Sequence, residues 1–266
     1  MKIKYKSCLL LLFLIQIGCS TVPLTGRRQL NLISDNEILA LSNQSYTTYM
    51  SSAKRSSNLS ERSQVERCGK KIRQAVERYF QQQGNSSLLN GYQWEFVLVQ
   101  DKTPNAFCLP GGKVVVYDGI LPYTKTETGL AVVLGHEIAH AVAKHSNERI
   151  SQQLLVETGG SILNLLMGSQ SSTAQNLVAS IYGLGSNYGV MLPFSRKQEY
   201  EADKLGLIFM AMAGYNPEEA VSFWSRMSDG NGAAVPEFMS THPADQNRIA
   251  YIRSVLPEII RTYYRK

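Results

Sequence analysis

One stretch of the chain, "AVVLGHEIAHAVAKH" (131–145), constrains the fold more than any other. It is apolar and favours a helix, yet it carries His136, Glu137 and His140 in its middle. Residues four apart lie on one face of a helix, so the two imidazoles can point at the same position. Burying two imidazoles and a carboxylate in an apolar helix costs free energy unless they gain a binding partner. We therefore expect a bound partner at this helix.

A zinc ion is the partner that this spacing favours. Two histidines four apart can both bind zinc, and Glu137 beside the first can take a proton from a water that the metal activates. A catalytic zinc site usually has three protein ligands and an open position. The extended form of the motif is excluded, because Ala143 and Ser146 replace its glycine and third histidine. His145 is predicted to be a surface histidine, since a continuing helix points it away from the pair.

The segment "SRKQEYEADKLG" (195–206) offers the third ligand. Glu199 and Asp203 are four apart and share a helix face, whereas Glu201 lies on the opposite face. We assign Glu199 to the metal and Asp203 to a hydrogen bond that orients a ligating imidazole. Glu201 is the alternative ligand. Without the histidine pair, the same residues would indicate only an acidic turn of a helix.

Three separated motifs resemble the gluzincin metallopeptidases related to the CaaX prenyl proteases. They are the HExxH sequence at 136–140, the ExxAD sequence at 199–203 and the late element "STHPADQNR" at 240–248. The chain looks most similar to the soluble bacterial members, among them envelope lipoproteins and outer-membrane-assembly proteases, and to the mitochondrial inner-membrane quality-control peptidase. The resemblance covers residues 60 to 255 and implies one Zn²⁺ per chain in an endopeptidase site.

The order of the expected elements predicts an α+β fold. Helices are expected over 34–54 and 60–83, strands over 92–101 and 111–119, and helices over 127–153, 196–213, 216–227 and from 244 onward. This order favours a mainly helical, zincin-like domain with a small β-sheet. The nearly uncharged segment 158–191 indicates either a mobile flap over a cleft or two short buried helices.

The segment "TPNAFCLPGG" (103–112) is bracketed by prolines, as is typical of an exposed edge. The resemblance implies that this edge strand lines the active-site cleft. We expect Asn105 and Ala106 to hold an extended peptide substrate through main-chain hydrogen bonds. His242 is expected to act in catalysis, either as a donor to the oxyanion or as a fourth zinc ligand that displaces the water. The remaining alternative is a histidine that only caps the last helix.

The first 18 residues resemble a signal peptide. Three lysines precede an apolar run from Cys8 to Ile17, which is too short for a bilayer of about 30 Å hydrocarbon thickness. Gly18 before Cys19 is typical of a bacterial lipoprotein signal, so we predict lipidation at Cys19, with an ordinary signal peptide as the alternative. Residues 19–33 are then an irregular, lipid-anchored tether, and residues 34–266 are the metallopeptidase domain.

Charge and cysteine content limit the partners. The net charge of +6 falls to +3 without the three signal lysines, and the remaining Lys and Arg are scattered, so no nucleic-acid partner is expected. An exported chain can oxidise Cys68 and Cys108 to a disulfide, but both lie in apolar patterns that favour buried free thiols.

These features together predict a zinc-dependent endopeptidase of the bacterial cell envelope, anchored to the membrane by lipid and facing the periplasm. Ser20 after Cys19 favours the outer membrane, by resemblance to lipoprotein sorting. Recognition through the peptide backbone suits unfolded or misassembled clients, and thus a role in protein quality control. The alternative is a chaperone-like assembly or binding factor with latent proteolysis. Glu137 favours the enzyme, because a pure binding protein has no need of a carboxylate between two zinc ligands.

Overall fold

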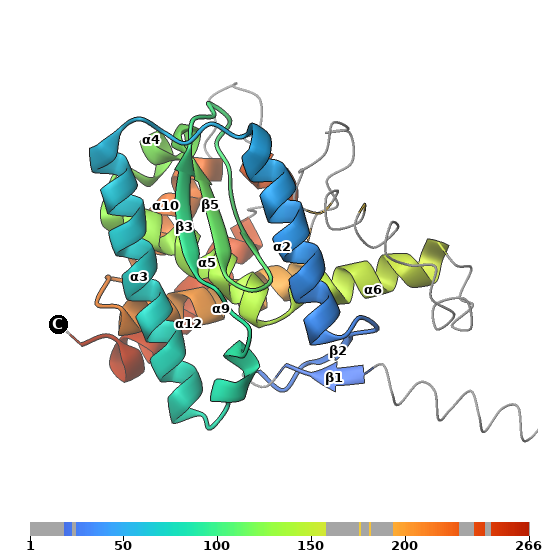
Figure 1. The fold of residues 1–266 in the computed structure, drawn as a ribbon. Coiled ribbons are helices and arrows are strands. Elements are labelled where there is room, and N and C mark those ends of the chain that lie inside the picture. The colour runs from blue at the N-terminus through green and yellow to red at the C-terminus, as the bar shows by residue number, and fades with distance from the viewer. Residues whose placement is uncertain are drawn as a thin grey trace, which may run out of the picture.

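The computed structural model describes residues 19–22, 25–157, 176, 181, 194–228, 237–242 and 246–265. Within these residues a three-stranded sheet is enclosed by helices (Figure 1), which confirms the predicted α+β class. Apart from residues 176 and 181, the segment 158–191 lies outside the described residues, and so does the predicted signal peptide. No described helix combines the length and the apolar character that crossing a membrane requires.

The sheet consists of β3 (Glu95–Val99), β4 (Ala106–Leu109) and β5 (Lys113–Tyr117) in the order β3-β5-β4. The central strand β5 pairs in parallel with β3 and antiparallel with β4. The third strand, β4, was expected only as an edge segment or loop, and it does form one edge of the sheet. The prediction of a small sheet with an edge strand is thus confirmed, but the predicted exposure of this strand is wrong, because Ala106–Leu109 are all buried.

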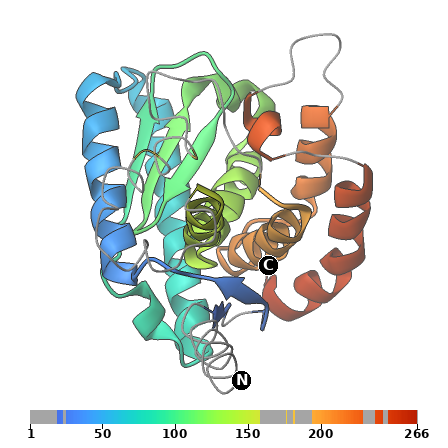
Figure 2. The ribbon, with the colours of Figure 1, turned by 90° about the vertical axis from the view of Figure 1, so that its right-hand side faces the viewer.

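The sheet separates two cores, because alternate side chains of a strand point to opposite faces. Val97, Phe107 and Val115 pack with α2 (Asp35–Ser52) on one face. The alternate residues of the same three strands point to the other face, where they pack with α3 (Leu59–Gln82) and α5 (Glu127–Val142). Figure 2 shows the resulting layers, which run from α2 through the sheet to the helices of the C-terminal half.

The remaining helices complete the layer that carries the candidate site. They are α4 (Leu121–Thr124), α6 (His145–Glu157), α9 (Arg196–Met212), α10 (Glu219–Ser228), α11 (Glu237–Thr241) and α12 (Gln246–Tyr263), with 3₁₀ turns at Ser86–Leu89 and Asp118–Ile120. The N-caps follow the sequence signals. The Ser34 side chain accepts a hydrogen bond from the amide of Glu37, and Ser195 and Gln198 form a capping box at α9.

The prediction of one continuous helix over 127–153 is wrong, because the helix is interrupted between α5 and α6. Lys144 at the break has a φ of +59°, in the left-handed region that non-glycine residues rarely adopt. Neither glycine nor proline marks the break, so the sequence pattern did not reveal it. The break turns His145 back toward α5, where its exposed fraction is 0%. The prediction of a surface histidine at 145 is therefore also wrong.

α5 and α9 cross with their backbones in contact. A Cβ atom built on Gly135 would lie 2.8 Å from the carbonyl oxygen of Gly206, closer than packed atoms approach. Only glycine at both positions allows this crossing. The close approach brings His136, the next residue on α5, beside the side chains of α9 that were predicted to assist the metal.

The predicted irregular tether over 19–33 is wrong in its local structure. β1 (Cys19–Thr21) and β2 (Arg28–Leu30) form an antiparallel hairpin, and Val22 and Gln29 are buried. Strands of three residues are too short to show an alternating pattern. The segment also binds α6, since the amide of Leu32 donates to Ser151 Oγ at 2.8 Å. It is thus packed against the domain.

Cys68 and Cys108 are both free and buried, which confirms the preferred prediction for the two thiols. Burial raises the pKa of Cys68 to about 12 and that of Cys108 well above its ordinary value. Both thiols are therefore protonated at neutral pH and act as small apolar side chains in the core.

Candidate metal centre

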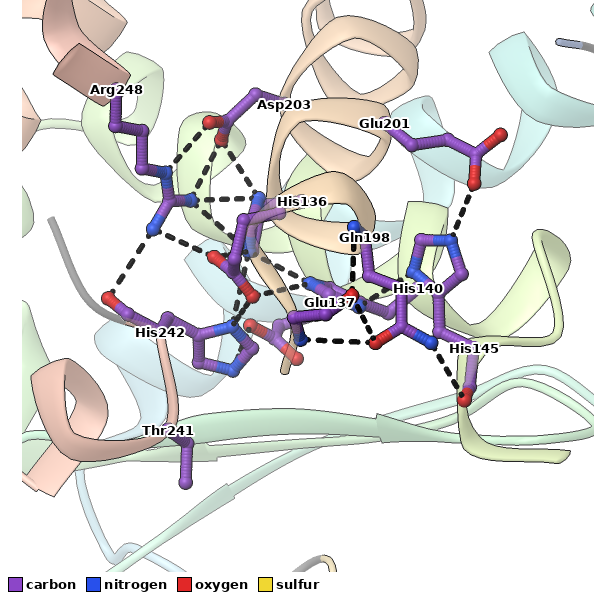
Figure 3. A network of polar contacts seen from close by, with 12 residues as sticks. His136, Glu137, His140, His145, Gln198, Glu201, Asp203, Thr241, His242 and Arg248 are labelled. Carbon is purple, nitrogen blue, oxygen red and sulfur yellow. Dashed lines mark hydrogen bonds and ion pairs between the residues drawn. The ribbon is translucent and has the colours of Figure 1, made fainter. Parts of the chain in front are cut away.

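Four buried side chains from three segments of the chain meet at one point. His136 and His140 come from α5, Glu199 from the first turn of α9, and His242 from the residue after α11, and one donor atom of each lies within 4.8 Å of all the others. Each of these residues is at most 3% exposed. Figure 3 shows the network around them. The three residues predicted as metal ligands are thus brought together.

The spacing of the donor atoms fits a tetrahedral zinc ion. His136 Nε2 lies 3.0 Å from His140 Nε2 and 3.2 Å from His242 Nδ1. Glu199 Oε1 lies 3.3 Å from His140 Nε2 and 3.0 Å from His242 Nδ1. Ligands about 2.0–2.1 Å from a tetrahedral zinc ion are about 3.3 Å apart. The donor set of three imidazoles and a carboxylate is one that zinc prefers, so these residues fit the metal that the sequence predicted.

Asp203 lies behind the first histidine, as predicted. The Nδ1 atom of His136 is 3.0 Å from Asp203 Oδ1, so Nε2 is left to face the metal. Arg248 from α12 donates to both oxygens of Asp203, at 2.6 and 2.7 Å. Burial opposes ionisation of Asp203, but the guanidinium outweighs burial and lowers its pKa. Asp203 is therefore a carboxylate in the buried site.

The two histidines of α5 that were predicted as ligands differ in their protonation without a metal. Burial lowers the pKa of His140 well below its ordinary value, so this imidazole is neutral. Burial also opposes protonation of His136, but Asp203 and Glu199 outweigh it and raise the pKa of His136 to about 9. A metal ion that binds here displaces that proton, because a histidine ligand must be neutral.

Glu137 is 2% exposed and points into the same space. Its Oε1 atom is buried and accepts no hydrogen bond from the described residues, and its nearest partner is His242 Nε2 at 3.4 Å. Burial raises the pKa of this carboxyl. A carboxylate oxygen without a hydrogen-bond donor beside a metal site, such as Oε1, is available to accept a proton from water. Its predicted catalytic role stays a prediction, supported by this position.

His242 is held among the ligand atoms rather than at a distance from them. Its amide donates to the carbonyl of Phe238 at 2.9 Å, and its own carbonyl accepts from Arg248 at 3.2 Å. The ring therefore sits with Nδ1 toward the metal position and Nε2 toward Glu137. Of the two roles expected for His242, this geometry corresponds to the fourth ligand. Pro243, the next residue, lies outside the described residues.

Asn105 and Ala106 lie at the edge strand, as predicted. Together with Phe107, Glu137, Phe194 and His242 they line a small cavity beside the metal position. The amide of Ala106 donates to the side-chain oxygen of Asn105 at 2.8 Å. The strand therefore borders the site, and its predicted contact with substrate stays a prediction.

Glu201, the alternative ligand, does not join the metal group. Its Oε2 atom lies 2.9 Å from His145 Nε2 and 2.6 Å from Arg27 Nε. The sequence pattern indicated no role in the site for His145, Arg27 or Arg248. Arg248 was present in the late motif, but nothing in its spacing indicated that it binds Asp203. Arg27 lies more than 100 residues before these partners, so no local pattern connects it with them.

A family model described as "Peptidase family M48" matches residues 69–256, which is more than half of the chain. The chain belongs to peptidase family M48. This confirms the resemblance drawn from the three motifs, and the matched region contains all four metal-facing residues of the site. The family assignment and the geometry of the donor atoms therefore agree on a zinc centre.

The named relatives are two metalloendopeptidases and one protease. The chain is 44% identical over 172 residues to mitochondrial metalloendopeptidase OMA1 of Schizosaccharomyces pombe, covering 64% of this chain and 49% of that protein. It is 29% identical over 245 residues to the human mitochondrial metalloendopeptidase OMA1, covering 90% of this chain and 46% of the relative. It is 29% identical over 169 residues to the beta-barrel assembly-enhancing protease of Escherichia coli, covering 60% and 34%. The chain thus spans about half or less of the length of these relatives.

Proposed function

We propose that the protein is a zinc-dependent endopeptidase. The observation that carries the proposal is the set of four buried donor atoms at tetrahedral spacing with the carboxylate of Glu137 beside them. Membership of peptidase family M48 and the named activity of the relatives support it. A purely structural zinc site needs no neighbouring carboxylate, whereas a hydrolytic site needs a base.

His136, His140 and Glu199 would hold the zinc ion, with Asp203 and Arg248 fixing the orientation of His136. When bound, zinc supplies a Lewis acid for the peptide carbonyl and for water. Glu137 accepts the proton of the attacking water and delivers it to the departing amine. The distance of 3.4 Å between Glu137 Oε1 and His242 Nε2 supports a shared role of the two side chains around the substrate carbonyl.

His242 is proposed to alternate between two positions. In the position that the structure shows, its Nδ1 atom lies 3.0 Å from Glu199 Oε1 and 3.2 Å from His136 Nε2, so it would bind zinc as a fourth ligand in place of the catalytic water. Displaced from the metal, the imidazole remains close enough to donate a hydrogen bond to the oxyanion. The first position would keep the enzyme latent until a substrate enters.

The edge strand β4 is the proposed substrate-binding element. The amide of Tyr117 donates to the carbonyl of Asn105, so the main chain of the next residue, Ala106, points away from β5 toward the open edge. There its amide is occupied by the Asn105 side chain. An extended peptide added to this edge would replace the Asn105 oxygen with its own carbonyl. Such binding reads the backbone and suits unfolded chains.

A role in protein quality control in the bacterial cell envelope is the physiological part of the proposal. One relative is a bacterial beta-barrel assembly-enhancing protease and others are mitochondrial enzymes, so the comparisons support a protease more directly than they support one compartment. The signal-like N-terminus and Cys19 favour a lipid anchor facing the periplasm. The alternative of a chaperone-like binding factor requires clients to be bound without being cleaved.

The test is digestion of a reduced, unfolded protein such as casein by the purified chain. We expect cleavage that stops with a zinc chelator and returns when stoichiometric zinc is added. Cleavage unaffected by the chelator would contradict the proposal. Chelator-sensitive binding of casein without any cleavage would instead favour the chaperone-like alternative.

Lipidation at Cys19 is tested separately in a bacterial host that carries the lipoprotein pathway. We expect wild-type chain to incorporate a fatty-acid probe, and Cys19→Ala to incorporate none and to keep its first 18 residues, because the modified thiol is absent. Cys8→Ala is the matched control, since it removes a cysteine from the predicted signal only. Equal labelling of Cys19→Ala and wild type would contradict the anchor.

A further inference from the structure

A second buried network starts from the side of His140 that faces away from the metal position. The Nδ1 atom of His140 lies 2.9 Å from Nδ1 of His145, and Nε2 of His145 lies 2.9 Å from Oε2 of Glu201. His145 is fully buried and Glu201 is 7% exposed. Three polar groups in line, shielded from water, form a continuous chain of hydrogen bonds behind a zinc ligand.

The direction of these hydrogen bonds follows from the chemistry of imidazole. A neutral imidazole carries one proton, and the nitrogen that binds a metal carries none. With Nε2 of His140 on the metal, its Nδ1 must hold the proton and donate it to His145. His145 then accepts at Nδ1 and donates from Nε2 to Glu201. Only one arrangement of the protons satisfies the whole chain, so the network orients His140.

The far end of the network lies in the N-terminal segment. Arg27 donates from Nε to Glu201 at 2.6 Å and pairs with Glu148 of α6 at 2.9 Å. The hydroxyl of Thr25 also donates to Glu201. Gln198 connects the two helices by donating to Glu148 at 2.8 Å. The guanidinium thus bridges α6 and α9 directly behind the site, and it supplies the positive charge for a carboxylate whose other partners are an imidazole and a hydroxyl.

The two histidines of the HExxH sequence are supported in the same way. Asp203 lies behind His136 and is held by Arg248. Behind His140, the imidazole of His145 connects the ring to Glu201, and Glu201 is held by Arg27. Each carboxylate fixes a ring and each arginine fixes a carboxylate. One of the two arginines lies on α12, and the other lies in the hairpin segment before the first long helix.

We propose that Arg27 is a positioning residue of the zinc site and that docking of the N-terminal segment is coupled to zinc binding. This inference rests on the proposed zinc site. By linkage the coupling is reciprocal: the docked segment raises zinc affinity, and bound zinc raises the stability of the docked segment. Displacement of the segment, for example by force transmitted through the proposed lipid anchor at Cys19, would then weaken the site.

Zinc affinity of the full chain tests the proposal without using peptidase activity. Competition with a chromophoric zinc chelator measures the dissociation constant. We expect Arg27→Ala to raise it about 10-fold or more, the range found when groups that support metal ligands are removed. Arg28→Ala is the matched control, because it removes the same charge from the next, exposed residue of the hairpin. It should bind zinc like wild type.

A double-mutant cycle tests the path through Glu201. In a Glu201→Gln background the ion pair between Arg27 and the carboxylate is already lost, so adding Arg27→Ala should weaken zinc binding by less than about twofold further. Equal zinc affinities of Arg27→Ala and Arg28→Ala would overturn the proposal while leaving the zinc site intact. Fully additive effects in the cycle would overturn it as well, since they exclude the connection through Glu201. A wild-type chain that binds no zinc would overturn the proposed function itself.

The expected effect of zinc on the docked N-terminal segment can be measured separately. Trypsin cleaves after Arg27 and Arg28 only when the hairpin leaves the surface, so chelation of zinc should increase the rate of cleavage there several-fold in wild type. In Glu201→Gln the rate should be high with and without zinc. A wild-type rate that zinc does not change would contradict the coupling.

Discussion

Glu137→Gln should lower kcat for peptide hydrolysis about 10²–10⁴-fold while the chain keeps its zinc, which is the range for loss of a general base. Glutamine matches the shape of glutamate, but its amide cannot accept the proton of the attacking water. The substitution removes no atom of the four-ligand group. KM should change little, since the carboxylate acts on the water and not on substrate binding.

An exposed carboxylate provides the control for this experiment. Glu258 lies on α12 with its side chain in solvent, so Glu258→Gln makes the same chemical change without touching the site. It should retain wild-type kcat and zinc content. A Glu137→Gln variant with near wild-type kcat would contradict the assigned base, and one without zinc would show that the residue has a structural role in the site.

Glu199→Ala should lose zinc, and Glu201→Ala should keep it. Glu199 Oε1 lies 3.3 Å from His140 Nε2 and 3.0 Å from His242 Nδ1, whereas Glu201 faces His145 and Arg27. Loss of a ligand should weaken binding more than the roughly 10–100-fold expected for loss of a supporting bond. Metal analysis after gel filtration separates the two cases. Zinc retained in Glu199→Ala and lost in Glu201→Ala would reverse the ligand assignment.

His242→Ala belongs to the same series and distinguishes the two positions proposed for this residue. Zinc should remain bound by the other three ligands, because a catalytic zinc site usually has only three. If His242 mainly closes the site, hydrolysis becomes faster than in wild type. If it mainly donates to the oxyanion, kcat falls with little change in KM. Unchanged hydrolysis and zinc affinity would assign it to the structure alone.

Most of the first layer of the site was predictable because it follows helix geometry. The spacing of four residues placed His136 with His140 on α5, and Glu199 with Asp203 on α9. In the structure His136, His140 and Glu199 meet at one point, and Asp203 lies behind His136. The α+β class was predictable from the order of apolar patterns. These features depend on residues close together in the sequence, where periodicity carries the information.

The residues that support the metal-facing side chains were not predictable. Their positions depend on the interruption between α5 and α6 and on contacts between residues far apart in the sequence. Lys144 adopts a left-handed conformation at a position where the sequence has no glycine to indicate it. This conformation turns the side chain of His145 toward His140. Arg27 meets Glu201 across 174 positions of the chain. Its segment was expected to be an irregular tether, since strands of three residues leave no pattern. The folded structure therefore adds the N-terminal hairpin to the site.

The zinc content of the purified chain tests the central claim most directly. Metal analysis of the wild-type protein, prepared without added chelator, should find one zinc per chain, and dialysis against a chelator should remove zinc and casein cleavage together. Returning one equivalent of zinc should restore both. A chain that cleaves casein with no zinc present, or that folds and binds no zinc at saturating concentration, would contradict a zinc-dependent peptidase site built from His136, His140 and Glu199.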